Sequence, residues 1–407
     1  MIDEFYKNGL AQDLSDFESF SEDQSKAMSL IKEWWKNSKT EKPYFVLGGC
    51  SGSGKSTLIK FVKEELGLKT HEVIYCAFTG KAALVLNRKG MSARTIHSTI
   101  YETYKKIIND KVEFFYRKVP AIFAKLIIVD EASMVSEEVF EDLMSFHVPI
   151  IFVGDHQQLP PVNSKFNLML KTDYRMEKVL RQMEDNPIIQ LSVKAIRGEN
   201  IAFKEYGENI KKIHYDDLQD EDLLNAGQIL VGTNAKKMMI NEIYRELKGY
   251  DKYIPQEDEK LIATANVRII SGKCGYVSSQ EPIQIFNGQI VYLLKDAIPQ
   301  KEYFVIEFMD ELERLNPIHG ALFEPKRILS VVGSDTGNKL LENKKYLNCG
   351  HFDYGYAISV HRSQGSSWKD VMVMDDKFGL WESKEMYNRW LYTAITRAEE
   401  TLTIVAK

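Results

Sequence analysis

A glycine-rich loop constrains the fold of this chain more than any other feature. The loop reads Gly49-x-x-x-x-Gly54-Lys55-Ser56 and follows the short apolar run Tyr44-Phe45-Val46-Leu47. From Lys55 onward, apolar residues recur at the spacing of a helix. A strand, this loop and a helix in that order form the phosphate loop, in which backbone N–H groups converge on a phosphate at the helix N-terminus. The sequence therefore predicts an α/β fold with a parallel sheet and a nucleotide site.

Residue types within the loop suit a triphosphate. The Lys55 ammonium would neutralise charge on the β and γ phosphates, and the Ser56 hydroxyl would complete a Mg²⁺ shell. We therefore expect ATP and Mg²⁺ as cofactors. The residues predicted to line the nucleotide are Gly49, Cys50, Ser51, Gly52, Ser53, Gly54, Lys55, Ser56 and Thr57.

A second apolar run ends in two carboxylates. Leu126 to Val129 reads as a buried strand, as does Ile150 to Val153, and Asp130 and Glu131 follow the first of them. Ligands of parallel α/β sheets gather at the carboxyl ends of strands. Asp130 would then hold Mg²⁺, while Glu131 would orient and deprotonate the attacking water. The other interpretation of such a pair is a helix cap.

Two arginines are candidates for contact with the γ-phosphate. Phosphoryl transfer uses cations there, and an arginine from a second domain makes hydrolysis depend on domain closure. Arg181 and Arg397 both lie in segments of the sequence that are rich in apolar residues. From spacing alone, each also fits a surface ion pair.

Other segments predict further elements. Ser21 followed by Gln24 forms a capping box ahead of a helix that extends to about Lys36. The Tyr- and Phe-rich segment from Ser98 to Lys125 reads either as a small β-hairpin or as a surface helix with a connector.

From about Pro282 the sequence pattern predicts only β-strands and turns. Asn287-Gly288 between apolar runs is a hairpin signal. We expect a small barrel over roughly 266–350, inserted into an α/β domain that resumes at Tyr356 and ends in a strand from Thr401 to Val405.

The amino-acid composition limits the possible ligands and the cellular compartment. Among 407 residues, 53 are Lys or Arg and 58 are Asp or Glu, so the net charge is −5 and a nucleic acid must bind in a local groove. Four widely separated cysteines argue against a zinc site and a disulfide framework. No signal peptide and no apolar run of about 20 residues is evident, so we expect a cytoplasmic protein with no membrane partner.

Several further motifs follow these in a characteristic order. They are Phe78-Thr79-Gly80-Lys81-Ala82-Ala83, Thr95-Ile96-His97, Gly154-Asp155-His156-Gln157-Gln158-Leu159-Pro160-Pro161-Val162, Val360-His361-Arg362-Ser363-Gln364-Gly365 and Leu391-Tyr392-Thr393-Ala394-Ile395-Thr396-Arg397-Ala398. As a set spanning residues 24 to 398, they resemble superfamily 1 DNA helicases of the RecD-like branch, which includes the Dda-type phage helicases. The resemblance implies two RecA-like P-loop domains, with ATP between them and a single strand lying across both.

The resemblance also assigns roles to residues. Gln24 would read the adenine edge; alternatively it serves only as the capping-box partner of its helix, and the two roles are compatible. Gln158 would sense the γ-phosphate, and Arg181 and Arg397 would be the paired arginine fingers. The positions that look like strand contacts, mainly to the backbone, are Thr79, Thr95, His97, Thr233, Asn234, Ser359 and His361. Seen alone, either histidine is more often an interior residue than a ligand-contacting one, and only the motifs favour contact with the strand.

Domain boundaries follow from the same resemblance. We expect domain 1A at residues 1–98 and 125–176, a hairpin insertion 1B at 99–124, domain 2A at 177–265 and 351–407, and an SH3-like barrel insertion 2B at 266–350. The chain is short for the family, and we expect neither a nuclease nor a long N-terminal domain. A partner-bound accessory domain is therefore unsupported.

The predicted function is ATP-driven translocation on single-stranded DNA, 5′ to 3′, with unwinding of duplex DNA in replication, recombination or repair. Phe114, Phe115 and Tyr116 of the hairpin would form the strand-separating wedge by stacking on the last base pair. Alternatively, these aromatic side chains pack the insertion onto domain 1A. Expected partners are single-stranded DNA, its junctions with duplex, and replication or recombination proteins; we expect a monomer.

Two other functions and one other substrate fit parts of this pattern. A strand-stimulated ATPase that displaces or loads proteins needs the same motor. A small-molecule phosphotransferase shares the phosphate loop, although the late Thr396-Arg397 motif speaks against it. RNA is an alternative strand, because backbone contacts hardly distinguish the sugars.

Overall fold

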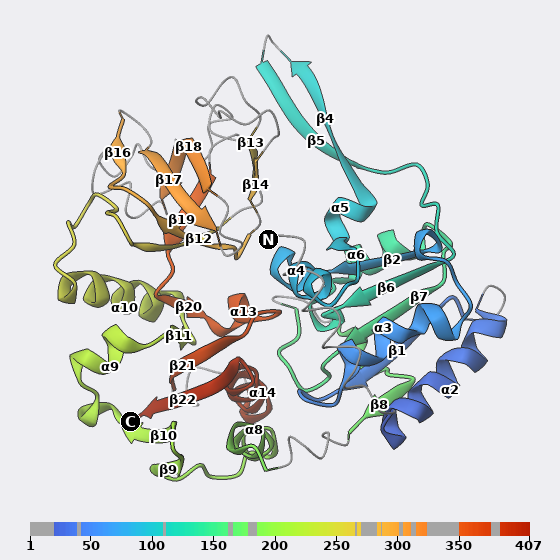
Figure 1. Cartoon of the computed structure of the whole chain (residues 1–407), viewed down its shortest axis with the longest axis horizontal. Coiled ribbons are helices and arrows are strands. Elements are labelled where there is room, and N and C mark those ends of the chain that lie inside the picture. Colours follow the sequence, from blue (N-terminus) through green and yellow to red (C-terminus); the bar gives the residue numbers. More distant parts are fainter. Residues whose placement is uncertain are drawn as a thin grey trace, which may run out of the picture. The chain divides into compact units, whose positions relative to one another are not determined.

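The computed structural model of the chain describes two units. It covers residues 20–38, 42–108, 111–161, 166–177, 185–264, 267–269, 283–285, 287–300, 304–310, 315–323, 350–375 and 383–407. Unit 1 comprises Met1–Ile201, Gln364–Ser366 and Trp381–Thr396, and unit 2 comprises Ala202–Ser363, Ser367–Leu380 and Arg397–Lys407. Each unit is built on its own parallel sheet (Figure 1).

The sheet of unit 1 has six strands in the order β3-β2-β6-β7-β1-β8, and every neighbouring pair is parallel. The predicted strands around the phosphate loop and before the acidic pair are all present. Their bounds are β1 (Tyr44–Gly49), β2 (Val73–Ala77), β3 (Ala93–Thr95), β6 (Leu126–Asp130), β7 (Ile150–Gly154) and β8 (Tyr174–Met176).

Both faces of this sheet are covered by helices. Phe45 and Leu47 of β1 pack into one core with α2 (Glu22–Asn37), α3 (Lys55–Glu65) and α4 (Gly80–Arg88). Val46, between them, points to the opposite core with α5 (Ile96–Ile100) and α6 (Glu137–Met144). This alternation within a continuous apolar run is what a strand buried on both faces produces.

Helix α2 begins where the sequence predicts. Ser21 is its N-cap, the Ser21 side chain accepts a hydrogen bond from the Gln24 N–H, and the Gln24 side chain accepts one from the Ser21 N–H. The capping box satisfies two of the N–H groups that a helix start leaves open.

A long antiparallel pair follows α5. Strand β4 (Tyr101–Ile108) pairs with β5 (Lys111–Lys118) in a register that runs from Tyr101 opposite Lys118 to Ile108 opposite Lys111. Figure 1 shows the pair projecting from unit 1 as a narrow arm.

The parallel sheet of unit 2 has the order β20-β11-β21-β22-β10-β9, in which only the β10–β9 pair is antiparallel. Helices α9 (Asp220–Asn225) and α10 (Asn234–Leu247) contribute to the core on one face. The strand bounds are β9 (Lys204–Gly207), β10 (Ile210–His214), β11 (Gln228–Val231), β20 (Ala357–Ser359), β21 (Trp368–Met374) and β22 (Ala398–Ala406).

A second sheet of unit 2 closes on itself. Its order is β15-β12-β19-β18-β17-β16, and β15 also pairs with β17, so five of its strands form a ring. The bounds are β12 (Lys260–Ala263), β15 (Ile290–Leu293), β16 (Ile298–Pro299), β17 (Phe304–Asp310), β18 (Leu315–Phe323) and β19 (Gly350–Tyr354). Separately, β13 (Val267–Ile269) pairs with β14 (Ile283–Ile285).

Three further helices complete the described chain: α8 (Pro187–Arg197), α13 (Val360–Ser363) and α14 (Lys384–Ile395). Short 3₁₀ turns are η1 (Thr70–Glu72), η2 (Ala132–Met134), η3 (Leu168–Leu170) and η4 (Tyr215–Asp217). Within the described ranges, no helix has the length and apolar character needed to cross a membrane.

Candidate active site

The phosphate loop lies between β1 and α3, as predicted. Gly52 and Gly54 have φ angles of 78° and 83°, values that glycine adopts without a steric penalty. Gly54 is the N-cap of α3, so Lys55, Ser56 and Thr57 form the first turn of that helix. The N–H groups of this first turn have no partners within the helix, so they and the helix dipole stabilise an anion bound at the N-terminus of α3.

Lys55 folds back onto its own loop. Its Nζ donates to the carbonyl oxygens of Gly49 and Cys50, at 2.8 Å each. The Ser53 hydroxyl donates to the same Cys50 oxygen at 2.9 Å. A Cβ at Gly49 would lie 2.6 Å from Ser53 Oγ, so any other residue at this position would displace the Ser53 side chain. The ammonium is thus held at the loop by neutral carbonyl groups, which a phosphate would outcompete.

Two predicted nucleotide residues have structural partners. The Gln24 side chain, besides its capping role, donates from Nε2 to the Gly54 carbonyl oxygen at 3.2 Å. Cys50 Sγ lies 3.9 Å from the Met176 carbonyl oxygen and 3.7 Å from that of Glu177. Burial raises the pKa of the Cys50 thiol, an effect that the Lys55 charge opposes. A thiol in this state is a poor nucleophile.

The acidic pair lies at the carboxyl end of β6, on the same edge of the sheet as the phosphate loop. Asp130 Oδ1 accepts a hydrogen bond from the Glu131 N–H at 2.9 Å. Burial raises the pKa of Asp130, while that hydrogen bond and the Lys55 charge lower it. Glu131 has a left-handed backbone, with φ 54° and ψ 40°. Such a conformation is uncommon for a residue with a side chain and marks a sharp exit from the strand.

Asp155, which the sequence places in a motif but not in the predicted site, lies directly after β7 and is 2% exposed. Its Oδ1 accepts from the Gln157 N–H at 2.9 Å. Its Oδ2 lies 3.5 Å from Gln158 Nε2. Gln158 Oε1 is buried and has no hydrogen-bond partner among the described residues. A buried amide oxygen of this kind needs a donor, which a ligand or water can supply.

Helix α14 brings a second unpredicted residue to this place. The Tyr392 hydroxyl donates to Asp155 Oδ2 at 2.6 Å and accepts from the Ser51 N–H of the phosphate loop at 2.9 Å. Burial raises the pKa of Tyr392, and the Asp155 charge adds to this. Its hydroxyl is therefore a permanent donor. The motif containing Tyr392 identifies its importance, but the pairing with Asp155 is visible only in three dimensions.

Two neighbours extend this contact between α14 and the segment after β7. Arg389 Nη1 donates to the His156 carbonyl oxygen at 2.6 Å. Thr393 Oγ1 accepts from the Leu159 N–H at 3.1 Å. Three side chains of one helix thus satisfy backbone and carboxylate groups beside the phosphate loop.

The predicted strand contacts of unit 1 follow strands on the same edge of the sheet. Thr79 and Thr95 are N-caps of α4 and α5, each accepting a backbone N–H with its hydroxyl oxygen. The His97 ring lies 6.0 Å from the Phe78 ring and 5.7 Å from the Tyr101 ring. Burial lowers the pKa of His97, although Glu138 opposes this, so the imidazole is neutral at pH 7.

The predicted strand contacts of unit 2 lie at the carboxyl edge of its own parallel sheet. Val231 of β11 pairs with Ser359 of β20. Thr233 then caps α10, whose first residue is Asn234. His361 lies in α13, directly after β20, and burial lowers its pKa. The sheet therefore brings these four residues to one edge.

The structure describes four of the five remaining predicted residues. Arg397 follows α14, is 6% exposed, and accepts the Trp368 N–H with its carbonyl oxygen. Arg181 lies outside the described residues. Phe114, Phe115 and Tyr116 lie in β5, opposite Lys105, Tyr104 and Thr103 of β4.

Comparison with known proteins gives consistent matches. The chain matches a family model described as an AAA domain over residues 21–216, and one described as a UvrD-like helicase C-terminal domain over residues 354–405. The ATP-dependent RecD2 DNA helicase of Deinococcus radiodurans is 28% identical over 377 residues, which cover 87% of this chain and 46% of that protein. The ATP-dependent DNA helicase dda of Enterobacteria phage T4 is 30% identical over 174 residues, covering 41% of this chain and 39% of that protein. The chain spans less than half the length of these two relatives.

Solved structures show the fold. Bacteroides Pif1 bound to ssDNA matches with a TM-score of 0.53 at 17% identity, covering 95% of this chain and 92% of that chain. A structure of DNA unwinding at forked dsDNA by two coordinating Pif1 helicases matches with a TM-score of 0.55 at 16% identity, with the same coverage. The parallel-sheet core is therefore RecA-like. The matches to the AAA domain model, RecD2 and Dda confirm the resemblance to superfamily 1 helicases of the RecD-like and Dda-like type.

Proposed function

We propose that this chain, a RecD-like and Dda-like protein of superfamily 1, is an ATP-dependent DNA helicase that translocates 5′ to 3′ on single-stranded DNA and unwinds duplexes. One observation carries the proposal. The phosphate loop and Asp130-Glu131 share the carboxyl edge of one parallel sheet, and a second parallel sheet in the same chain presents Thr233 and Ser359 at its own carboxyl edge. A motor that moves along a strand needs two such edges, whereas a small-molecule phosphotransferase needs one and an acceptor pocket.

Hydrolysis would use the residues of unit 1. Lys55 would exchange its contacts with the Gly49 and Cys50 carbonyl oxygens for phosphate oxygens, which are stronger acceptors. Ser56 and Asp130 would hold Mg²⁺, and the ion would neutralise charge on the phosphates. The donor set fits a hard cation, because a hydroxyl and a carboxylate are oxygen ligands.

Glu131 and Gln158 would act on the attacking water and the γ-phosphate. Glu131 would orient the water and take its proton. Among the described residues, the buried Gln158 Oε1 has no hydrogen-bond partner, which supports a role in contact with this water or with phosphate-bound water. Arg397 and Arg181 would stabilise the transition-state charge when the two RecA-like domains close.

The strand would run over the carboxyl edges of both sheets. The side chains that would contact it are Thr79, Thr95, Thr233, Asn234, Ser359 and the neutral histidines His97 and His361. Neutral side chains contribute hydrogen bonds to the backbone rather than charge. The 5′ to 3′ polarity is supported by the RecD-like motifs alone. The β4–β5 arm would be the 1B insertion, at the proposed residues 99–124, with Phe114, Phe115 and Tyr116 as the wedge. The closed five-stranded ring would be the SH3-like 2B insertion. Its strands β12 and β19 lie at or beyond the two ends of the proposed range 266–350, so the insertion would extend further in both directions.

A tailed-duplex unwinding assay tests the proposal. Matched DNA and RNA duplexes carry either a 5′ or a 3′ single-stranded tail, with Lys55→Ala as the inactive control. We expect ATP-dependent separation of the 5′-tailed DNA duplex by a monomer. Preference for the 3′ tail would refute the polarity. Strand-stimulated ATP hydrolysis without separation of any duplex would instead favour an ATPase that displaces or loads replication or recombination proteins.

A further inference from the structure

One carboxylate contacts both strands of the β4–β5 arm at its root. Asp142 lies on α6, and its Oδ2 accepts a hydrogen bond from the Tyr101 hydroxyl. Its Oδ1 forms an ion pair with Lys118 Nζ at 2.8 Å. Tyr101 is the first residue of β4 and Lys118 the last of β5, and the two are cross-strand partners. The two oxygens of one side chain therefore hold the two strands at the same rung.

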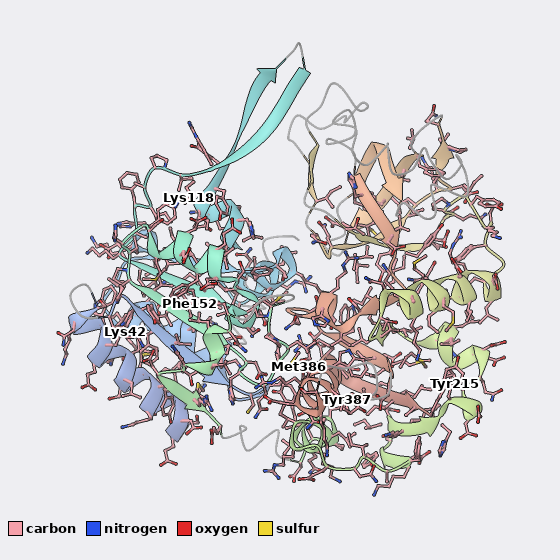
Figure 2. All side chains as sticks on the ribbon, turned by 180° about the vertical axis from the view of Figure 1, so that it is seen from behind. Lys42, Lys118, Phe152, Tyr215, Met386 and Tyr387 are labelled. Atoms are coloured by element: carbon pink, nitrogen blue, oxygen red, sulfur yellow. The ribbon has the colours of Figure 1, made fainter. Side chains whose placement is uncertain are left out.

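The root is anchored further through neighbouring groups. Lys118 Nζ also lies 3.3 Å from Ser145 Oγ, at the end of α6. The Val119 N–H donates to the Ile100 carbonyl oxygen at 2.9 Å, which extends the ladder one step below the Asp142 contacts. Figure 2 labels Lys118 at the foot of the arm. Burial raises the pKa of Asp142, but the hydrogen bonds from Lys118 and Tyr101 outweigh it, so the carboxylate stays ionised at neutral pH.

Helix α6 is a firm support for this carboxylate. Leu143, the next residue, is fully buried and Val139 is 6% exposed, both in the core that contains Phe152 of the sheet. Asp142 is therefore connected rigidly to the sheet of unit 1. An isolated two-stranded hairpin is at best marginally stable in water, so an arm of this kind takes its direction from such supports.

Rigidity at the root matters because the arm is long. Phe114 lies four residues from Lys118 along β5, or about 13 Å at ~3.3 Å per residue. A tilt of about 10° at the root would displace that position by about 2 Å, over half of the ~3.4 Å rise between base pairs.

We propose that Asp142 is a positioning residue for strand separation, which clamps both strands of the β4–β5 arm to unit 1 so that the arm resists the load of the duplex. This inference rests on the proposed helicase function. In the described part of the chain, the Asp142 carboxylate binds Tyr101 and Lys118, and neither is a predicted nucleotide residue. Its effect is therefore on the coupling between ATP hydrolysis and unwinding.

The test compares Asp142→Asn with Tyr101→Phe and with a matched control, Glu102→Gln. Asn keeps the shape of Asp142 but loses the charge, and Phe removes only the Tyr101 hydroxyl. Glu102 pairs with Arg117 at 2.7 Å on the next rung, where the contact joins strand to strand rather than to α6. Base pairs separated per ATP hydrolysed are measured on the 5′-tailed duplex, with strand-stimulated ATPase on single strands alone. Hydrogen exchange of the β4 and β5 amides reports the clamp directly.

We expect Asp142→Asn to lower the base pairs separated per ATP by about tenfold, the factor that a change of ~1.4 kcal/mol produces. Tyr101→Phe should show a smaller loss, and Glu102→Gln almost none. ATPase should stay within about twofold of wild type, while root amides exchange faster in Asp142→Asn. Unchanged coupling, or ATPase and unwinding lost in proportion, would overturn the inference. Failure of the wild-type protein to unwind any duplex would overturn the proposed function instead, and unchanged hydrogen exchange would separately exclude the clamp.

Discussion

Removal of the Tyr392 hydroxyl tests the contact between α14 and the phosphate loop. In Tyr392→Phe the ring remains, but Asp155 loses its 2.6 Å donor and the Ser51 N–H loses its acceptor. Tyr392 and Asp155 are 1% and 2% exposed, so water cannot easily replace the hydroxyl. Hydrogen bonds to charged groups contribute about 1.5–3 kcal/mol, and a buried unpaired group costs about 1–3 kcal/mol.

We therefore expect the free energy of unfolding of unit 1 to fall by about 2–3 kcal/mol. Asp155 keeps its hydrogen bond from the Gln157 N–H, so the expected loss of stability is smaller than the sum of the two full contributions. Urea denaturation measures the change. Tyr75→Phe is the matched control, because that buried hydroxyl of unit 1 makes one 3.4 Å contact with the neutral Ile59 carbonyl oxygen. Its loss should be well under about 1 kcal/mol.

Nucleotide affinity gives a second measurement on the same variant. The Tyr392 hydroxyl accepts a hydrogen bond from the Ser51 N–H of the phosphate loop, so a bound phosphate would compete for that N–H or bind beside it. We expect the Kd for ATP in Tyr392→Phe to be unchanged or lower. A stability equal to wild type, or clearly weaker ATP binding, would refute the reasoning about this contact.

Three substitutions test the proposed catalytic roles. Lys55→Ala should abolish ATP hydrolysis and unwinding with the fold intact, and residual ATPase above about a tenth of wild type would contradict its assignment. Glu131→Gln should retain ATP affinity while turnover is lost, as seen by equilibrium binding and steady-state kinetics; loss of binding would indicate a structural or metal-bound Glu131. Arg397→Ala should lower kcat far more than nucleotide affinity, and a variant close to wild type would remove this arginine from the site.

The phosphate loop and the acidic pair could be predicted because each is a local pattern. A strand, a glycine-rich turn and a helix occupy consecutive residues, and the capping box of Ser21 and Gln24 needs only three residues of spacing. Such features depend on backbone sterics and hydrogen bonding within one segment, which the sequence contains in full.

The contacts of Asp155 and Asp142 could not be predicted, because each joins segments that are distant in the chain. Tyr392 reaches Asp155 across 237 positions, and Tyr101 reaches Asp142 across 41. A motif identifies a residue of this kind as significant but does not identify its partner. The left-handed backbone at Glu131 was equally invisible, because the residue type does not favour it.

Gln24 illustrates how structure adds a competing role to a predicted one. Its Oε1 accepts from the Ser21 N–H and its Nε2 donates to the Gly54 carbonyl oxygen, so both ends of the amide have partners. A contact with adenine would have to be shared with these bonds or replace the one to Gly54. Its assignment as the adenine reader stays a prediction.

The close packing of Gly154 against the turn that follows Asp130-Glu131 leads to a last prediction. A Cβ built on this residue at the end of β7 would lie 2.6 Å from Met169 Sδ and 3.0 Å from the backbone N of Ser133. Ser133 belongs to η2, the turn that begins directly after Glu131. The methyl group of Gly154→Ala would therefore push on this turn, since the Met169 side chain can move aside but the backbone cannot.

We expect Gly154→Ala to destabilise unit 1 by about 1–3 kcal/mol, the usual cost of overpacking, and to lower kcat for ATP hydrolysis with little change in ATP affinity. The double variant Gly154→Ala with Met169→Ala separates the two contacts. It removes the sulfur from the path of the new methyl group but leaves the 3.0 Å approach to Ser133 N. If η2 transmits the effect to Glu131, kcat stays low in the double variant. Recovery of wild-type kcat would show that crowding by Met169 alone was responsible, and that the position of Glu131 does not depend on the glycine behind it.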